Sequence, residues 1–255
     1  MSASALTVVV VYPDLLGTYG DGGNGVVLAR RAAWRGIGAE LVESASDRPL
    51  PAGHLYCLGG GEDGPQVQAA ESLAADGALA RAVGSGAAVL AVCAGYQIAG
   101  RRFPDAGGRA RPGLGLLDVA TSKAAGRRAV GEVVAEPLDG GPAPGPLPTL
   151  TGFENHGGVT MVGPGARPLA RVTAGVGNGA GDRTEGAWAG RVVGTYLHGP
   201  VLARNPALAD LLLSWAVGSA LEPLDDAEER ALRTERLAAA GRRGLTRFAR
   251  RRARA

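Results

Sequence analysis

The sequence is poor in the residues that build disulfide frameworks and metal sites. Its 255 residues include two cysteines, Cys57 and Cys93, and three histidines, His54, His156 and His198. Two cysteines are too few for a disulfide scaffold, and no zinc-ligand spacing connects them with the histidines. We therefore expect no metal in this chain and a reducing, cytoplasmic location.

Long apolar runs are also missing. No stretch approaches the roughly 20 apolar residues that a membrane-spanning helix needs. The first residues, MSASALTVVVVYPD, have neither a basic leader nor an A-x-A cleavage pattern. We expect the short β-branched run to be the first strand of a globular domain.

Lysine occurs once, as Lys123, so the positive charge comes from arginine. Residues 241–255 hold seven arginines and no acidic residue, so the rest of the chain is net acidic although the whole carries +3. Only Phe248 interrupts these arginines as an aromatic residue, which argues against nucleic-acid binding. We predict a globular domain over 1–240 and a disordered tail over 241–255, either simply solvated or weakly attracted to an anionic membrane face.

Apolar strand-like runs alternate with helical patterns up to residue 100, and glycine-rich turns follow the strands. This alternation predicts an α/β fold: a doubly wound, mostly parallel, flavodoxin-like sheet flanked by helices, with its site at the carboxyl edge of the strands. The expected elements are strands at Leu6–Val11, Ala39–Glu43, Leu55–Leu58 and Ala87–Val92, and helices over 26–38 (capped by Asn24) and 66–83.

The pattern changes after residue 100. Residues 101–115 and 139–150 are rich in glycine and proline, so we expect loops there. We predict further strands over 128–135 and 192–197, and helices over 205–220 and 225–240.

The stretch AAVLAVCAGYQIAG, residues 87–100, has the layout of a nucleophile elbow. A buried strand leads to one cysteine, Cys93, and a glycine and a helix follow it. The N–H groups and partial positive charge of a helix amino terminus favour a thiolate there. From this stretch alone, a buried core cysteine is an equal alternative.

Two more features are expected at the same sheet edge. Gly59–Gly61 ends a neighbouring strand, where backbone N–H groups could approach a developing oxyanion, and His198 follows a late strand as the candidate general base. Of the remaining candidates, Cys57 is interpreted as a core residue and His156 as a structural or interface residue. We interpret His54 as a solvated loop residue.

These motifs together resemble the class I, triad-type, glutamine amidotransferases, in the branch related to cobyric acid synthase. Within that branch, four segments are similar to the glutaminase subunits of lipid II isoglutaminyl synthases. They are YPDLLGTYGDGGN (12–24), GGGED (59–63), GFENHGG (152–158) and YLHGP (196–200), the last followed by NP.

The resemblance assigns roles to individual positions. It implies that Cys93 is the nucleophile and His198 the base, and that Arg128 holds the substrate carboxylate, with Arg127 as the neighbouring choice. It further implies that Ala94 and one of Gly60 and Gly61 form the oxyanion hole, and that Gln97 orients the substrate.

The resemblance also implies a reaction and a partner. Glutamine would be hydrolysed here, and ammonia would pass to a Mur-ligase-like subunit, MurT, in a heterodimer. That partner would hold ATP and Mg²⁺ and amidate the D-glutamate of lipid II in peptidoglycan synthesis, while this chain needs no cofactor. The alternatives are an amidotransferase for a corrinoid or other cofactor acid, and a non-catalytic scaffold.

One position departs from the wider class. Many class I enzymes have a glutamate two residues after the histidine, where this chain has Pro200. Either a dyad suffices or the partner supplies the acid, and we favour the partner because an unoriented imidazole loses control of its tautomer. The loop Asp21-Gly22-Gly23-Asn24 lacks the Lys-Ser/Thr of a phosphate loop, so we expect no ATP there.

Overall fold

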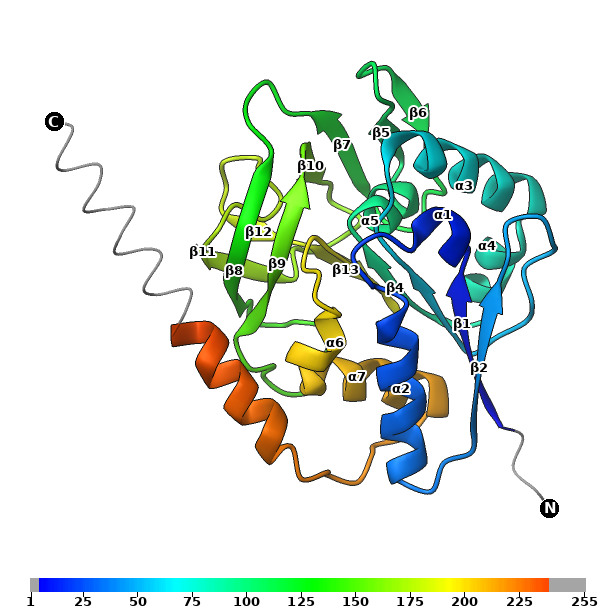
Figure 1. Cartoon of the computed structure of the whole chain (residues 1–255), viewed down its shortest axis with the longest axis vertical. Coiled ribbons are helices and arrows are strands. Elements are labelled where there is room, and N and C mark those ends of the chain that lie inside the picture. The colour runs from blue at the N-terminus through cyan, green and yellow to red at the C-terminus, as the bar shows by residue number, and fades with distance from the viewer. Residues whose placement is uncertain (1–4, 239–255) are drawn as a thin grey trace, which may run out of the picture.

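The computed structural model describes residues 5–238 (Figure 1). Its centre is a six-stranded sheet in the order β13-β14-β4-β3-β1-β2, parallel except for the edge strand β13. The doubly wound α/β prediction is confirmed. The strands are β1 (Leu6–Val11), β2 (Ala39–Ser44), β3 (Leu55–Leu58), β4 (Ala88–Val92), β13 (Ala187–Ala189) and β14 (Val192–Thr195).

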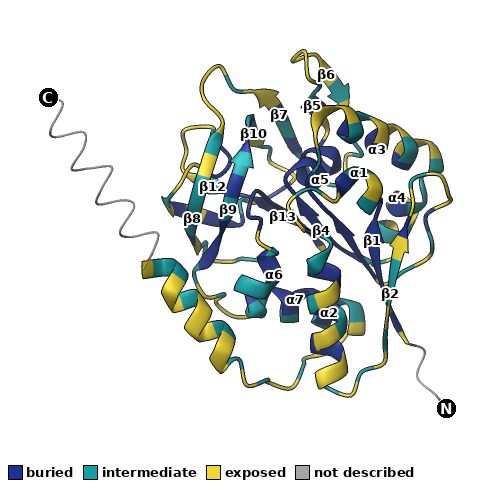
Figure 2. Cartoon of the chain, viewed as in Figure 1, coloured by how far each residue is buried: buried dark blue, intermediate teal, exposed yellow. Residues whose placement is uncertain are grey.

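Helices cover both faces of this sheet (Figure 1). One face carries α2 (Gly23–Trp34), α6 (Val201–Arg204) and α7 (Pro206–Val217). The other carries α1 (Pro13–Leu16), α3 (Asp63–Asp76), α4 (Ala78–Gly84) and α5 (Ala94–Ala99). Every residue of β4 and α5 is buried (Figure 2), which explains why β4 is apolar throughout rather than alternating.

Two helix predictions were wrong in detail. The predicted helix over 66–83 is two helices, because Gly77 adopts φ 65° between α3 and α4 and ends the first of them. Asn24 lies inside α2 rather than capping it, and the capping position is Gly22. The side chain of Asn24 instead donates to the Asp21 carbonyl (3.0 Å) and accepts from the Leu202 N–H (3.0 Å).

Residues 102–185 add two four-stranded sheets, of whose strands the sequence predicted only the one over 128–135, which is β8. The first, in the order β10-β7-β5-β6, includes a hairpin inside the expected 101–115 loop. Its strands are β5 (Arg102–Pro104), β6 (Ala110–Pro112), β7 (Val119–Lys123) and β10 (Gly158–Val162). The second, in the order β12-β11-β8-β9, holds β8 (Ala129–Pro137), β9 (Leu150–His156), β11 (Ala170–Ala174) and β12 (Thr184–Glu185).

The described chain ends in a helix over residues 227–238. Buried Arg31 of α2 binds Asp210 of α7 (2.7 Å) and Asp226 (2.6 Å), and this contact holds the start of the last helix against the sheet layer. The predicted arginine-rich tail, 241–255, lies outside the described residues. Within residues 5–238, none of the helices has the length and apolar character needed to cross a membrane.

Candidate active site

Cys93 occupies a sharp turn between β4 and α5. Its backbone has φ 52° and ψ −104°, a conformation that costs energy for any residue except glycine. Close packing holds the turn, because a Cβ on Gly95 would lie 2.7 Å from the Leu58 Cβ. The N–H of Gly95 also donates to the Gly59 carbonyl (3.0 Å). This strand–turn–helix geometry is that of the predicted nucleophile elbow.

His198 lies at the same sheet edge because β14 runs parallel to β4 as its direct neighbour. The Cys93 N–H donates to the Thr195 carbonyl (2.9 Å), which ties the two strand ends together. The backbones of His198 and Phe153 exchange two hydrogen bonds, of 2.8 and 3.1 Å. The strand pairing therefore brings together two residues that are about a hundred positions apart in the sequence.

Asp21 completes the arrangement from this chain itself. Its Oδ2 lies 2.8 Å from Nδ1 of His198, and both side chains are buried. The other ring nitrogen, Nε2, has no hydrogen-bond partner within residues 5–238. A carboxylate on Nδ1 fixes the tautomer and leaves Nε2 for the reacting groups. The premise that this chain offers no acid to orient His198 is corrected, because Asp21 occupies that position, and an additional acid from the partner stays a prediction.

The electrostatics of His198 follow from these neighbours. Burial lowers its pKa, but the hydrogen bond to Asp21 and the negative charge of nearby Cys93 outweigh burial and raise the pKa from 6.5 to about 10. A histidine that keeps its proton at neutral pH stabilises a thiolate beside it. The pair is therefore set up for nucleophilic attack by sulfur.

The glycines after β3 have separate roles. The N–H of Gly60 donates to Oδ2 of Asp21 (2.8 Å), so it holds the acid and is not free for an oxyanion. A Cβ on Gly60 would lie 2.7 Å from Cε1 of His198, so only glycine fits under the ring. Gly61 and Ala94 line the pocket, and the N–H of Ala94 is in the first helical turn, without an acceptor inside the helix. Of the two expected glycines, Gly61 is the one that lines the pocket, and its role in an oxyanion hole stays a prediction.

A small cavity of about 80 Å³ opens beside Cys93, and we call it the Cys93 pocket. Arg128 lines it, whereas the neighbouring Arg127 does not. The Arg128 guanidinium donates to Asn155, from Nε to Oδ1 (3.2 Å) and from Nη2 to the carbonyl oxygen (3.1 Å). The pocket thus combines a nucleophile with a cation that suits a carboxylate.

Gln97 also lines the pocket, but its amide is already engaged. Its Oε1 accepts from Gln66 (2.9 Å), and its Nε2 donates to the Tyr196 hydroxyl (3.2 Å). That hydroxyl lies 2.6 Å from Oγ1 of Thr160, within a buried polar network. The structure therefore places Gln97 as a support beneath the pocket, and its expected role in orienting substrate stays a prediction.

Tyr19 is a pocket residue that the sequence reasoning missed. Its ring centroid lies 4.8 Å from that of His198, and its hydroxyl accepts a hydrogen bond from Nδ2 of Asn155 (2.9 Å). Both Tyr19 and Asp21 belong to the glycine-rich loop after β1, which carried part of the family resemblance but to which no site role was assigned. The rule that parallel strands present their loops at one edge could have placed this loop at the site.

The other cysteine and the other histidines have structural surroundings. Complete burial raises the pKa of Cys57 from 9.0 to about 12, so its thiol stays protonated and unreactive at neutral pH. His156 lines the pocket, yet its Nδ1 lies 3.0 Å from the Gly158 carbonyl, and its ring stacks on Tyr196 at 3.7 Å. His54 is exposed, and its Nδ1 accepts from the Thr7 N–H (3.0 Å).

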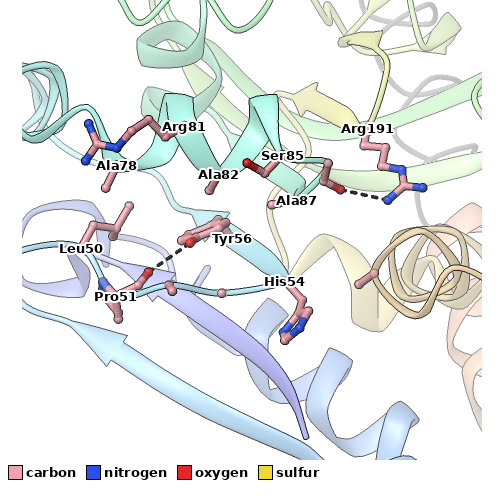
Figure 3. Close-up of a pocket in the computed structure, with 14 residues that line it drawn as sticks. Leu50, Pro51, His54, Tyr56, Ala78, Arg81, Ala82, Ser85, Ala87 and Arg191 are labelled. Carbon is pink, nitrogen blue, oxygen red and sulfur yellow. Dashed lines mark hydrogen bonds between the residues drawn. The ribbon is translucent and has the colours of Figure 1, made fainter. Parts of the chain in front are cut away.

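A larger cavity, of about 540 Å³, lies at the opposite, amino edge of the sheet (Figure 3). Its wall includes His54 before β3, Ala87 before β4 and Arg191 before β14. Arg191 is held there by hydrogen bonds to the Gly86 and Trp215 carbonyls, both 2.9 Å. None of the candidate catalytic side chains lines this cavity. The volume of a cavity therefore does not identify the candidate active site in this molecule.

The CobB/CobQ-like glutamine amidotransferase domain matches residues 7–206. The lipid II isoglutaminyl synthase (glutamine-hydrolyzing) subunit GatD of Staphylococcus aureus is 35% identical over 83% of this chain and 84% of the relative. The GatD subunit of Streptococcus pneumoniae is 31% identical over 83% and 80%. Among solved structures, a glutamine amidotransferase from Thermotoga maritima shares the fold, with a TM-score of 0.53 at 16% identity, covering 91% of this chain and 95% of that one.

The match spans most of the described chain and includes Cys93, Asp21 and His198. The elbow, the strand order and the sheet-edge position of these residues agree with it. The chain therefore belongs to the family of CobB/CobQ-like glutamine amidotransferase domains.

Proposed function

We propose that this chain hydrolyses L-glutamine to L-glutamate and ammonia through a thioester on Cys93. The observation that carries the proposal is the 2.8 Å contact between Asp21 and His198, at the sheet edge where the elbow holds the cysteine. A thiolate, a protonated imidazole and an orienting carboxylate form a complete set for acyl transfer from an amide.

In the first half-reaction, the Cys93 sulfur attacks the amide carbon of glutamine. The oxyanion that forms accepts hydrogen bonds from the N–H groups of Ala94 and Gly61. His198 then donates its Nε2 proton to the amide nitrogen, the C–N bond breaks, and ammonia leaves. Arg128 binds the α-carboxylate of the substrate throughout.

In the second half-reaction, neutral His198 takes a proton from water, and the resulting hydroxide attacks the thioester carbonyl. The C–S bond breaks, glutamate leaves, and the sulfur returns as thiolate beside the protonated imidazole. Asp21 keeps the ring in one orientation in both halves, so the same nitrogen gives and receives the proton.

We further propose that the ammonia is passed to a Mur-ligase-like subunit, MurT, at the cytoplasmic side of the membrane. There, the partner would use ATP and Mg²⁺ to amidate the D-glutamate α-carboxyl of lipid II, giving D-isoglutamine, while this chain binds no cofactor. The support is that both GatD relatives carry the name of lipid II isoglutaminyl synthase subunits and match most of this chain.

The test is ammonia release from glutamine, measured with and without the Mur-ligase-like partner. Wild-type protein should release ammonia, Cys93→Ala should fall to background, and Cys57→Ala should keep the activity as the matched control. Equal background rates for wild type and Cys93→Ala in both conditions would contradict the proposal. Ammonia incorporation into a corrinoid acid instead of lipid II would identify the alternative acceptor.

A further inference from the structure

Asn155 contacts three separate parts of the site. It is half-buried near the end of β9 and lines the Cys93 pocket, opposite β8 across an antiparallel pair. Its contacts reach the guanidinium of Arg128, the phenol of Tyr19 and the sulfur of Cys93. None of these contacts is needed for the strand pairing itself.

The contact with Arg128 fixes the direction of the guanidinium. Oδ1 of Asn155 accepts from Nε, and its carbonyl oxygen accepts from Nη2, so one edge of the planar group is held by a single residue. Nη1 and the second proton of Nη2 are not used by Asn155. A bidentate contact with a carboxylate needs two such N–H groups side by side.

The contact with Tyr19 closes the other side of the pocket. Nδ2 of Asn155 donates to the phenol oxygen (2.9 Å), and the phenol ring lies against the His198 imidazole, 4.8 Å between centroids. Tyr19 is 40% exposed and has φ 69°, an unfavourable backbone conformation for a bulky side chain. Its position over the imidazole therefore depends on partners such as Asn155.

The contact with Cys93 relates the position of the sulfur to that of the Arg128 guanidinium. The sulfur lies 4.0 Å from the carbonyl oxygen of Asn155, the same atom that accepts from Nη2 of Arg128. One carbonyl group thus lies between the nucleophile and the cation that would hold the substrate carboxylate. The separation of these two groups must match the length of the amide substrate.

We propose that Asn155 is a positioning residue that sets the distance from Arg128 to Cys93 and so selects glutamine over shorter or carboxylate-free amides. The inference rests on the proposed function, since it assumes that Arg128 binds the substrate carboxylate. A side chain of equal size without hydrogen-bonding groups would remove the contact with Nε and leave the guanidinium held by Asn155 only through Nη2 and the backbone carbonyl, so the planar group could pivot about that single contact. The carboxylate would then no longer be presented at a fixed distance from the sulfur.

The experiment measures covalent labelling of Cys93 in the full-length chain by mass spectrometry. One reagent is 6-diazo-5-oxo-L-norleucine, which mimics glutamine and alkylates a thiolate with loss of N₂. Its D-enantiomer and iodoacetamide, which has no carboxylate, are the comparison reagents. The variants are Asn155→Leu, Tyr19→Phe and, as the matched control, Arg127→Ala, whose side chain is outside the pocket.

Asn155→Leu should slow labelling by the glutamine mimic about tenfold, the usual effect of losing hydrogen bonds to a charged group, and leave iodoacetamide labelling within about twofold. Tyr19→Phe, which removes one neutral hydrogen bond, should slow labelling by the glutamine mimic less than Asn155→Leu does. Arg127→Ala should be labelled at the wild-type rate. Steady-state hydrolysis should show a raised KM for glutamine and a smaller preference for glutamine over asparagine.

Two failures are distinguishable. If wild-type protein shows no preference for the L-enantiomer over the D-enantiomer, the proposed function itself is wrong. If wild type shows that preference and Asn155→Leu keeps it with unchanged labelling rates, the function stands and the role of Asn155 is overturned. An equal loss of labelling with the mimic and with iodoacetamide would show a general disturbance of the elbow, which also overturns the inference.

Discussion

Asp21 and His198 are separated by 177 positions in the chain, yet Oδ2 of the first lies 2.8 Å from Nδ1 of the second. Each comes from a loop at the carboxyl edge of the sheet, one after β1 and one after β14. The N–H of Gly60 donates to the same carboxylate oxygen, so a third loop holds the pair in place. The orienting acid is therefore built into this chain.

Asp21→Asn should lower the rate of glutamine hydrolysis by at least about 100-fold, because an amide cannot hold the imidazole in the required tautomer and charge. The protein should remain folded, since the substitution keeps the shape of the side chain. The matched control is Asp14→Asn in the preceding helix α1, where the carboxylate is exposed and accepts hydrogen bonds from Ser46. Full activity of Asp21→Asn would remove Asp21 from the mechanism.

The raised pKa of His198 predicts how stability depends on pH. In the unfolded chain this histidine loses its proton near pH 6.5, whereas in the folded protein it keeps the proton up to about pH 10. Its stabilising contribution is therefore complete below pH 6.5 and is lost as the pH rises towards 10. Between pH 7.5 and 9, the free energy of unfolding should fall with a slope approaching about 1.4 kcal/mol per pH unit from this group.

Urea unfolding of wild type and His198→Gln at several pH values in this range checks the slope. Burial also raises the pKa of Glu185 to about 7 and that of Cys57 to about 12, but both groups are present in both proteins. Their contributions cancel in the difference between the two curves. Carrying Cys93→Ala in both proteins also removes the proton of the Cys93 thiol, which would offset that of His198, and leaves the hydrogen bond to Asp21 to raise the pKa of the histidine. A difference that does not change with pH would contradict the raised pKa of His198.

The sequence predicted those parts of the site whose geometry is local. Cys93 was recognisable because strand, turn and helix follow one another directly, and His198 because it follows a strand that enters the same parallel sheet. Asp21 was not recognised, because its contact depends on how a glycine-rich loop crosses two strand ends. No local pattern encodes that path.

Gly60 is a second residue whose contact with a distant loop could not be predicted from the sequence. The run of glycines after β3 predicted backbone donors near the site, but not that Asp21 would take the N–H of Gly60 and leave Gly61 at the pocket. Of the strands of residues 102–185, the one over 128–135 was predicted and is β8; the others were missed because each is stabilised by pairing with a distant segment. The β7–β10 pair, for example, joins Lys123 to Gly158.

Gly60→Ala should reduce hydrolysis by about 100-fold or more, because a Cβ there would lie 2.7 Å from Cε1 of His198 and must displace the ring from its working position. Gly64→Ala is the control, since a Cβ at that position, in the first turn of α3, meets no atom within 4 Å. Rates of ammonia release and thermal unfolding midpoints of both variants provide the comparison. Activity of Gly60→Ala equal to that of Gly64→Ala would show that the imidazole tolerates the displacement.

The last prediction concerns the buried arginine that joins α2, α7 and the final helix. Arg31 is almost completely buried, with Nε and Nη2 on Asp210 and Nη1 on Asp226, at 2.6 to 2.8 Å. Replacing it by methionine keeps much of the volume but leaves Asp226 without this arginine and Asp210 with Arg35 alone (2.8 Å), which costs about 1 to 3 kcal/mol.

Urea unfolding of Arg31→Met should show that loss, and limited proteolysis should cut residues 218–238 faster than in wild type. Arg30→Met is the matched control, because Arg30 is the exposed neighbour on the same helix. Its unfolding free energy should stay within about 0.5 kcal/mol of wild type, as is usual for surface positions. The helix α2 that carries Arg31 begins shortly after Asp21. The rate of glutamine hydrolysis by Arg31→Met, measured at low temperature where the variant stays folded, therefore reports whether the ion pairs of Arg31 also position Asp21. Unchanged stability of Arg31→Met would mean that the carboxylates find other partners and that the final helix is held by its apolar contacts alone.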